Sequence, residues 1–393
     1  REGDKNINSY VYPQYPMEKI MDTMRPIYEK AVADAKAADT PEKRRGVGIA
    51  WGGFNVTEGG GDSAEVALEL MPGNKIRKYD TWHAMGQGAT TGSLVVTLEA
   101  LKEMHLTPED IQLIQNDTKT CPDTGMAGAS RSLYMDGNAT IIAANKLLAA
   151  MRKEDGTLRT YDEMKAEGIE TKYLGRYETN TTPGLCRLDP NTGIGDPTPA
   201  FTYCLNLAEV EVDTKTGKTT VLKFTCVDFV GRIGNIDAVN GQAYSGIMHG
   251  IGFALKEDYA DVKKHANMFG AGTSYIKDVP DDINLIHIDG AISDGPFGSS
   301  GASEAFQASG HCAVLNGIYN ACGVRIHEIP ALPEKVKAGL DAIAKGEKPY
   351  EPKKYFLGSD MYEELENIKE NPVQVGTQSF YVSLDDPTAE RPF

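Results

Sequence analysis

The sequence predicts an α+β fold with two related lobes, one over residues 46–151 and one over about residues 202–344. Two observations favour this fold. In each half, a strand pattern leads through a glycine-rich loop, at residues 86–92 and 294–303, into an apolar helical pattern. In the second half, valine and leucine alternate on both sides of the turn 213–217, which is the pattern of an antiparallel hairpin.

Four segments follow along the chain. They are an N-terminal helical arm (1–45), a first lobe with its connection (46–199), a second lobe (200–344) and a C-terminal extension (345–393). Apolar residues at helical spacing between residues 17 and 37 predict the helix of the arm. Alternating or apolar runs predict strands at 47–51, 64–70, 76–82, 111–116, 202–212, 219–228 and 284–289. Helical patterns predict helices that start near residues 88, 130, 235 and 304. The polar stretch 154–199 is interpreted as a connection between the halves, and the extension as an arm over a partner, with disorder as its alternative.

The composition is that of an acidic globular protein. The chain has 393 residues, of which 40% are hydrophobic and 24% charged, and 56 acidic against 40 basic side chains give a net charge of -16. Such a charge repels a phosphate backbone, so we expect no nucleic-acid partner. No run of about 18 apolar residues is present and the start lacks the apolar stretch of a signal peptide, which predicts a cytoplasmic protein without a membrane span. Because the chain begins with arginine, a cut from a longer precursor is one expectation and a separate gene product the other.

The six cysteines are spread along the chain without a CxxC pair or a spacing suited to zinc or an iron–sulfur cluster. We expect them to be reduced and mostly buried, and we expect any iron–sulfur cluster to lie on another chain. The seven histidines contain no HExxH pair, so the sequence predicts no metal-ligating side chain.

Two loops of the first half are candidates for ligand binding, although each has an ordinary structural explanation. Gly86, Gln87 and Gly88 follow a strand and open a helix, which suits a phosphate or pterin site or a structural glycine turn. The spacing departs from a dinucleotide fingerprint, and the preceding strand is too polar for one buried on both faces of a parallel sheet. Small residues at 123–132 permit a close backbone approach to a ligand, with a helix N-cap at Ser130 as the alternative.

Two further candidates lie in the second half. Glu304 follows a glycine-rich loop in the first turn of a predicted helix, with Ser303 as the expected N-cap. Its carboxylate suits a general base, or it only favours the helix start. Gln242 lies on a helix with glycines at positions 241, 246, 250 and 252, which predicts that a ligand or another helix approaches it closely.

In this order, these loops and the Gln242 helix resemble the molybdenum hydroxylases, the family of xanthine oxidase and aldehyde oxidoreductase. The resemblance covers about residues 1–344 and is greatest to bacterial aldehyde oxidoreductases that carry molybdopterin cytosine dinucleotide. It implies the two-lobed molybdopterin-binding fold of that family and identifies Glu304 as the catalytic base. It also implies a set of cofactor-binding residues: Gly86, Gln87, Gly88, Gly128, Ala129, Ser130, Ser132, Gln242 and Ser303. In that family the pterin dithiolene holds the molybdenum, so no protein ligand to the metal is implied.

The resemblance further implies partners and a reaction. The chain matches only the C-terminal half of the family's molybdenum region, so the N-terminal half and a two-iron–two-sulfur subunit are expected on companion chains, with an FAD subunit as an optional third. The implied reaction oxidises a small molecule, an aldehyde or an N-heterocycle, with oxygen from water. An NAD-dependent dehydrogenase built on the Gly86 loop and a non-catalytic assembly subunit are the alternatives.

The sequence departs from the family pattern at three places. Ser303 replaces a glycine, His249 replaces a glutamine, and Ala305 with Phe306 follows the glutamate where the family commonly has a proline. Ser303 would narrow the space beside the metal or donate an extra hydrogen bond, which predicts a substrate other than the commonest one of the family.

Overall fold

The computed structural model describes residues 3–4, 14–57, 61–115, 117–179, 189, 191–195, 198–292, 294–349 and 370. The chain divides into two compact units, Arg1–Pro349 and Tyr350–Phe393, and the description below concerns the first. The predicted C-terminal extension beyond residue 349 lies outside the described residues, apart from Glu370.

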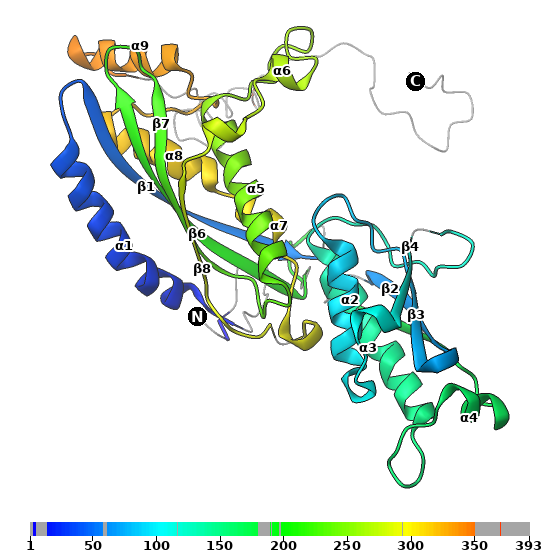
Figure 1. The fold of residues 1–393 in the computed structure, drawn as a ribbon. Helices are drawn as coiled ribbons and strands as arrows, with labels where there is room; N and C mark the ends of the chain where they lie inside the picture. Colours follow the sequence, from blue (N-terminus) through cyan, green and yellow to red (C-terminus); the bar gives the residue numbers. More distant parts are fainter. Residues whose placement is uncertain are drawn as a thin grey trace, which may run out of the picture. The chain divides into compact units, whose positions relative to one another are not determined.

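A four-stranded sheet forms the centre of the second lobe (Figure 1). Its strands are β1 (Lys43–Val56), β6 (Ala200–Asp213), β7 (Thr219–Phe229) and β8 (Asp282–His287), in that order. The pairs of β1 with β6 and of β6 with β7 are antiparallel, whereas β8 runs parallel to β7. One face of the sheet packs against α1 (Met17–Ala38), and the other packs against α5 (Ile236–Leu255) and α8 (Gly310–Cys322).

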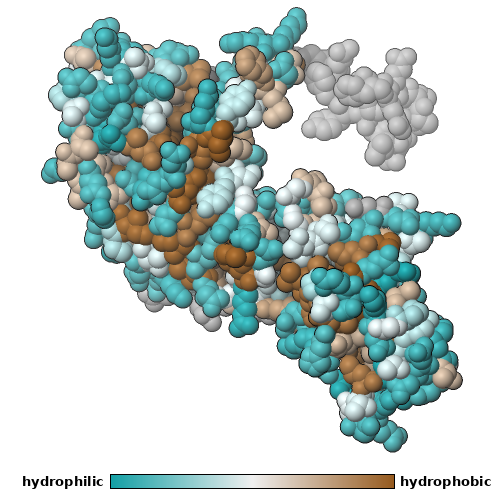
Figure 2. Space-filling view, in the orientation of Figure 1, coloured by the Kyte–Doolittle hydropathy of each residue, from teal (hydrophilic) through white to brown (hydrophobic). Residues whose placement is uncertain are grey.

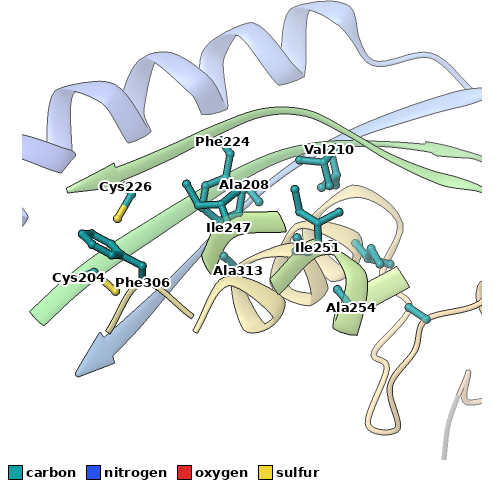
Figure 3. Close-up of a cluster of buried hydrophobic side chains, with 14 of the residues drawn as sticks. Cys204, Ala208, Val210, Phe224, Cys226, Ile247, Ile251, Ala254, Phe306 and Ala313 are labelled. Atoms are coloured by element: carbon teal, nitrogen blue, oxygen red, sulfur yellow. The ribbon is translucent and has the colours of Figure 1, made fainter. Parts of the chain in front are cut away.

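Alternation along β6 explains the two packed faces. Leu205 and Leu207 are buried in the apolar cluster that contains α1 residues, whereas Cys204 and Ala208 belong to the cluster formed with α5 and α8. Figure 3 shows the second cluster, with Phe306 beside Cys204. Since Phe306 is 0% exposed, this core anchors the chain two residues after Glu304.

A second four-stranded sheet, of order β4-β3-β2-β5, forms the first lobe. Its strands are β2 (Ser63–Met71), β3 (Lys75–Asp80), β4 (Ile111–Gln115) and β5 (Lys172–Glu178). β3 and β4 are parallel, and the other pairs are antiparallel. Helix α3 (Arg131–Met151) packs on β2 and β5 and against α2 (Ala89–Ala100). The remaining helices of the described residues are α4 (Tyr161–Ala166), α6 (Met268–Ala271), α7 (Ser303–Gln307) and α9 (Pro333–Ala344). The 3-10 turns are η1 (Pro72–Asn74), η2 (Lys102–Met104), η3 (Pro108–Asp110), η4 (Ile276–Asp278) and η5 (Pro296–Gly298).

Mixed helices and sheets confirm the predicted α+β class, but three local features differ from expectation. β1 belongs to the second-lobe sheet although we expected it in the first lobe, because alternation indicates a strand without indicating its partner. The stretch predicted as a connection contains α4 and β5, whose patterns are short and polar. The polar strand β3 is buried, since Lys78 and Asp80 are 0% exposed and form an ion pair. The division into four segments stays a prediction.

The five described cysteines are free thiols: Cys121, Cys204, Cys226, Cys312 and Cys322. Cys204 and Cys226 are buried and Cys312 is exposed, while Cys186 lies outside the described residues. Within the described part of the chain, none of the helices combines the length and the apolar character that a membrane span requires.

Candidate functional site

The two lobes meet at the carboxylate of Glu304, the second residue of α7. The backbone N–H of Ser130 donates to Glu304 Oε1 at 3.2 Å, and the Ser130 hydroxyl donates to Glu304 Oε2. Glu304 is half-buried. Each carboxylate oxygen keeps a lone pair after accepting one bond, so the group is held in place and can still accept a proton.

Ser130 reaches this carboxylate because the backbone turns sharply before α3. Ala129 and Ser130 have φ values of 49° and 50°, a left-handed conformation that is unfavourable for residues other than glycine and is frequent at functional sites. The N–H of Thr57 donates to the Ala129 carbonyl at 2.8 Å and anchors the turn. Ser130 occupies the N-cap position of α3, but its side chain makes no capping hydrogen bond within the described residues. The predicted N-cap role is therefore wrong at the level of the side chain, which binds Glu304 instead.

Arg131, which was not among the predicted site residues, anchors the loop that leads into this turn. Its side chain is 2% exposed and binds Asp62 at two points, from Nε to Oδ2 at 2.7 Å and from Nη2 to Oδ1 at 2.8 Å. Its Nη1 donates to the carbonyls of Thr124 and Met126, at 3.0 and 2.7 Å. The small-residue loop is thus tied to α3. An arginine at the start of an apolar helix is the available signal, but spacing alone does not identify its acceptors.

The loop that precedes Glu304 packs directly on α3. A Cβ atom on Gly301 would lie 1.8 Å from the Ser130 carbonyl oxygen, and one on Gly137 would lie 2.5 Å from Pro296 Cγ. Such distances leave no room for a side chain, so these glycines allow the two backbones to touch. Ser303 begins α7 and Ala302 is its N-cap, which corrects the predicted N-cap at Ser303.

The structure also brings the glycine loop (residues 86–88) to the start of α5. Gly88 precedes α2 with φ 84°, and a Cβ atom on Gly88 would contact Ala238 Cβ at 3.5 Å. Gln242 follows Ala238 by one helical turn and shares its side of α5. The Gln87 side chain is folded onto its own loop, where Nε2 donates to the His83 carbonyl at 2.6 Å.

A buried polar group ties α5 to the sheet next to Gln242. His287 Nδ1 lies 2.8 Å from Asp228 Oδ2, and His287 Nε2 lies 2.8 Å from Asn240 Oδ1. Burial raises the pKa of Asp228, which His287 partly offsets. Asn240 is two residues before Gln242 and therefore lies on the opposite side of α5, so this contact holds the helical turn that carries Gln242 against the sheet.

Several of the candidate residues leave room for a ligand. No atom of the described residues lies within 4 Å of a Cβ atom added to Gly86 or Gly241, and the nearest atom at Gly128 is Met126 Cε at 4.0 Å. Ser300 Oγ is buried and has no hydrogen-bond partner in the described part of the chain. Ser132 and Ser303 are half-buried at the starts of α3 and α7. Open space and an unpaired donor fit a polar cofactor better than a packed core.

The described residues contain no group of three or more histidine, cysteine, aspartate or glutamate side chains that could hold a metal ion.

Comparison with known proteins identifies the family. A family model described as the molybdopterin cofactor-binding domain matches residues 24–280. The chain belongs to this family. The open space beside the glycines and the unpaired Ser300 hydroxyl, both within the described part of the chain, fit a bound molybdopterin.

The relatives are named as aldehyde oxidoreductases and as a subunit of a xanthine dehydrogenase. The aldehyde oxidoreductase of Megalodesulfovibrio gigas is 39% identical over 342 residues, which are 87% of this chain and 37% of the relative. One subunit of a probable xanthine dehydrogenase of Bacillus subtilis is 24% identical over 321 residues, which are 76% of this chain and 42% of the relative. The crystal structure of the aldehyde oxidoreductase of Desulfovibrio desulfuricans has a TM-score of 0.82 and 42% identity, and covers 86% of this chain and 37% of that one.

These comparisons confirm the predicted fold and family. They also show that the chain spans less than half the length of these relatives, at least one of which is named as a subunit of a larger enzyme. The nicotinamide dehydrogenase alternative receives no support, because the matching domain binds a molybdopterin and the strand before the glycine loop lies in a mixed sheet.

Proposed function

We propose that this chain is the base-carrying part of the molybdopterin-binding subunit of a molybdenum hydroxylase, which oxidises an aldehyde or an N-heterocycle with oxygen from water. One observation carries the proposal. Ser130, in a predicted cofactor loop, holds the carboxylate of Glu304, so that the loop and the base form one site. The names of the relatives support both substrate classes, and the 39% identity to an aldehyde oxidoreductase favours an aldehyde.

The proposed reaction adds the oxygen atom of water to the substrate carbon and releases two protons and two electrons. When bound, the molybdenum–pterin group supplies the metal that accepts these electrons. Glu304 accepts a proton from the attacking oxygen atom, at a carboxylate lone pair that Ser130 does not use. Both Ser130 donors come from a rigid turn, which keeps the carboxylate oriented toward that oxygen.

We propose the cytosine dinucleotide form of the cofactor, bound by the nine residues that the resemblance implies. The N–H groups at the start of α2, next to the glycine loop, suit a phosphate or a polar pterin edge. Gln242 would donate to the pterin, and the turn at Ala129 and Ser130 would hold it from the other lobe. Support comes from the free space at Gly86 and Gly241. Ser303, next to Glu304, would narrow the substrate space relative to glycine.

We further propose that the chain works in a cytoplasmic complex with companion chains. These would be the N-terminal half of the molybdenum region, a two-iron–two-sulfur subunit and, as an optional third, an FAD subunit. The partial coverage of the relatives and the absence of cluster-binding cysteine spacing in the sequence support this proposal. Figure 2 shows apolar areas on the surface, and the segment between α5 and β8 exposes Phe269 and Ile276 to 84% and 88%. The free thiols of the described part suit a reducing compartment.

The substitution Glu304→Gln tests the base. It keeps the shape and most hydrogen bonding of the side chain but removes the proton acceptor, so turnover per molybdenum should fall by about 10²–10⁴-fold with unchanged molybdenum content. Glu334→Gln is a matched control, because Glu334 is also the second residue of a helix, α9. It should leave turnover unchanged.

Metal and nucleotide analysis of the purified complex separates the alternatives. Molybdenum with a cytosine-containing pterin supports the proposal, and a complex that carries neither would favour a non-catalytic assembly subunit. Near wild-type turnover of Glu304→Gln would return this glutamate to a structural role.

A further inference from the structure

A buried ion cluster joins β3 and α3, the elements next to the two candidate loops of the first lobe, residues 86–88 and 123–132. Lys78 Nζ is 2.7 Å from Asp136 Oδ1 and 3.3 Å from Asp80 Oδ2, and all three side chains are 0% exposed. We call these residues the buried triad. Lys78 and Asp80 lie on β3, whereas Asp136 lies on α3, so the ammonium group joins two separate elements.

Asp80 connects the triad to the glycine loop. Its Oδ1 accepts from the backbone N–H of Trp82 at 3.3 Å, and its Oδ2 accepts from the Ser93 hydroxyl of α2 at 2.7 Å. Gln115 Nε2 also donates to Asp80 Oδ1 at 2.7 Å, and Gln115 Oε1 accepts from Thr90 in the first turn of α2 at 3.1 Å. Asp80 therefore holds both ends of the segment that contains residues 86–88.

Asp136 connects the triad to the turn that binds Glu304. It lies in α3, six residues after Ser130, and its neighbour Gly137 touches Pro296 in the loop that precedes Glu304. Asn138 Nδ2 donates to the backbone carbonyl of residue 294 in that same loop, at 3.0 Å. A shift of this turn of α3 would move both partners of the Ser130–Glu304 contact.

The charges of the triad do not balance. One ammonium group faces two carboxylates, and Asp136 Oδ2 is buried without a hydrogen-bond partner among the described residues. Buried ion pairs commonly stabilise a fold no better than apolar side chains of the same volume, and their best-attested use is to fix one arrangement of the elements that they join. We propose that the buried triad fixes the position of the glycine loop relative to Ser130. It would thereby fix the position of the bound cofactor relative to the carboxylate of Glu304.

The double substitution Lys78→Met with Asp136→Leu removes the link with little change of volume. Asp80 keeps its three hydrogen-bond donors, from Trp82, Ser93 and Gln115, but it loses its counter-ion in this variant. Since apolar replacement of a buried ion pair is often tolerated, we expect the complex to assemble, with a melting temperature lowered by the loss of that counter-ion. A control variant of lowered stability therefore distinguishes a loss of stability from a loss of positioning.

The experiment measures two properties of the purified complex. Hydrogen exchange should become about tenfold faster at residues 86–92 and 129–132, in the range typical of coupling between sites. Molybdenum content should fall below half of the wild-type content. The second readout rests on the proposed function, but the first does not. Leu147→Ala is the control, because it truncates a side chain of α3 that is 0% exposed and packs in the apolar cluster of Leu68 and Leu70, whose residues lie outside 86–92 and 129–132. It should lower the melting temperature without singling out these two segments in exchange.

Wild-type exchange and molybdenum content in the double variant would overturn the proposal. If the double variant does not assemble, Asp136→Leu alone is measured in the same way, since Lys78 then keeps Asp80 as its counter-ion. Failure of both variants to fold would also overturn it, because the triad would then hold the lobe and not the loops. A wild-type complex without molybdenum would contradict the proposed function, while the exchange data would still test the triad.

Discussion

Replacing Ser130 with alanine tests how far the proposed base depends on its orientation. The change removes the hydroxyl that donates to Glu304 Oε2 and leaves the backbone N–H, which is 3.2 Å from Oε1. Alanine adds no backbone strain beyond that of serine, because both residues carry a Cβ atom in the left-handed conformation of φ 50°, which the neighbouring Ala129 also adopts at φ 49°. The turn can keep its course, so the carboxylate should lose one of its two donors and little else.

The expected effect follows from the strength of that bond. A hydrogen bond to a charged group contributes about 1.5–3 kcal/mol, and about 1.36 kcal/mol corresponds to a tenfold change in rate. Loss of the whole contribution would lower turnover by about 10–150-fold. Since the N–H donor remains, we expect a loss of turnover near the lower end of this range, about tenfold. This loss is smaller than the one expected for Glu304→Gln.

The assay is turnover per molybdenum in the purified complex, with Ser130→Gly as the matched control. Glycine also lacks the hydroxyl, but it relieves the left-handed backbone strain at this position. Both variants should therefore lose the same turnover, while the glycine variant should melt at the higher temperature. Wild-type turnover of Ser130→Ala would refute the reasoning. So would full turnover of the glycine variant alone, because backbone strain and not the hydroxyl would then control the base.

Three further substitutions test the surroundings of the site. A Cβ atom on Gly301 would lie 1.8 Å from the Ser130 carbonyl oxygen, so Gly301→Ala should lower turnover per molybdenum more than Ser130→Ala does, and a smaller loss would count against the packing. Gly241→Ala should stabilise the cofactor-free chain by about 1 kcal/mol in urea unfolding, yet lower molybdenum content, because its Cβ enters the open space; unchanged content would contradict the cofactor placement. Burial raises the pKa of Asp136 from 3.8 to about 6, so between pH 3.8 and about 6 the folded state binds a proton that the unfolded state has lost. The contribution of Asp136 to stability is therefore full below pH 3.8 and is lost as the pH rises through about 6. Asp136→Asn should remove about 3 kcal/mol of that pH-dependent loss, measured by urea unfolding from pH 4 to 7, and equal slopes for variant and wild type would contradict it.

Local patterns predicted much of the fold. Helical spacing after Gly88 and after Ser130 predicted α2 and α3, and alternation around the turn 213–217 predicted the hairpin of β6 and β7, as the structure has them. The same reasoning missed β5, because its pattern is short and its partner strand is remote. Arg176 of β5 pairs with Glu65 of β2, which is 111 residues earlier. A single short run does not carry information about such a partner.

The candidate site is built from contacts between residues that are even farther apart in the sequence. Ser130 and Glu304 are 174 residues apart in the sequence, and Arg131 and Asp62 are 69 residues apart. The resemblance to the molybdenum hydroxylases identified Ser130 and Glu304 one at a time, and their contact emerged only from the structure. Lys78 argued against a ligand site at the glycine loop, because charged residues in the preceding strand indicate an exposed strand unless their counter-ions are known. The structure supplies those counter-ions, and the polarity then becomes part of the support of the loop.

The glycines of α5 show how the structure separates packing from ligand binding. The sequence predicted that a ligand or another helix approaches α5 closely. A Cβ atom on Gly246 would lie 2.7 Å from the Phe306 backbone, and one on Gly250 would lie 2.9 Å from Gly310, so these two glycines let α7 and α8 pack on the helix. At Gly241, no atom of the described residues lies within 4 Å of such a Cβ. Glycine costs a helix about 1 kcal/mol relative to alanine, and no packing at this position offsets that cost. A ligand beside Gly241 would offset it, which is why we place the cofactor on this side of α5, next to Gln242.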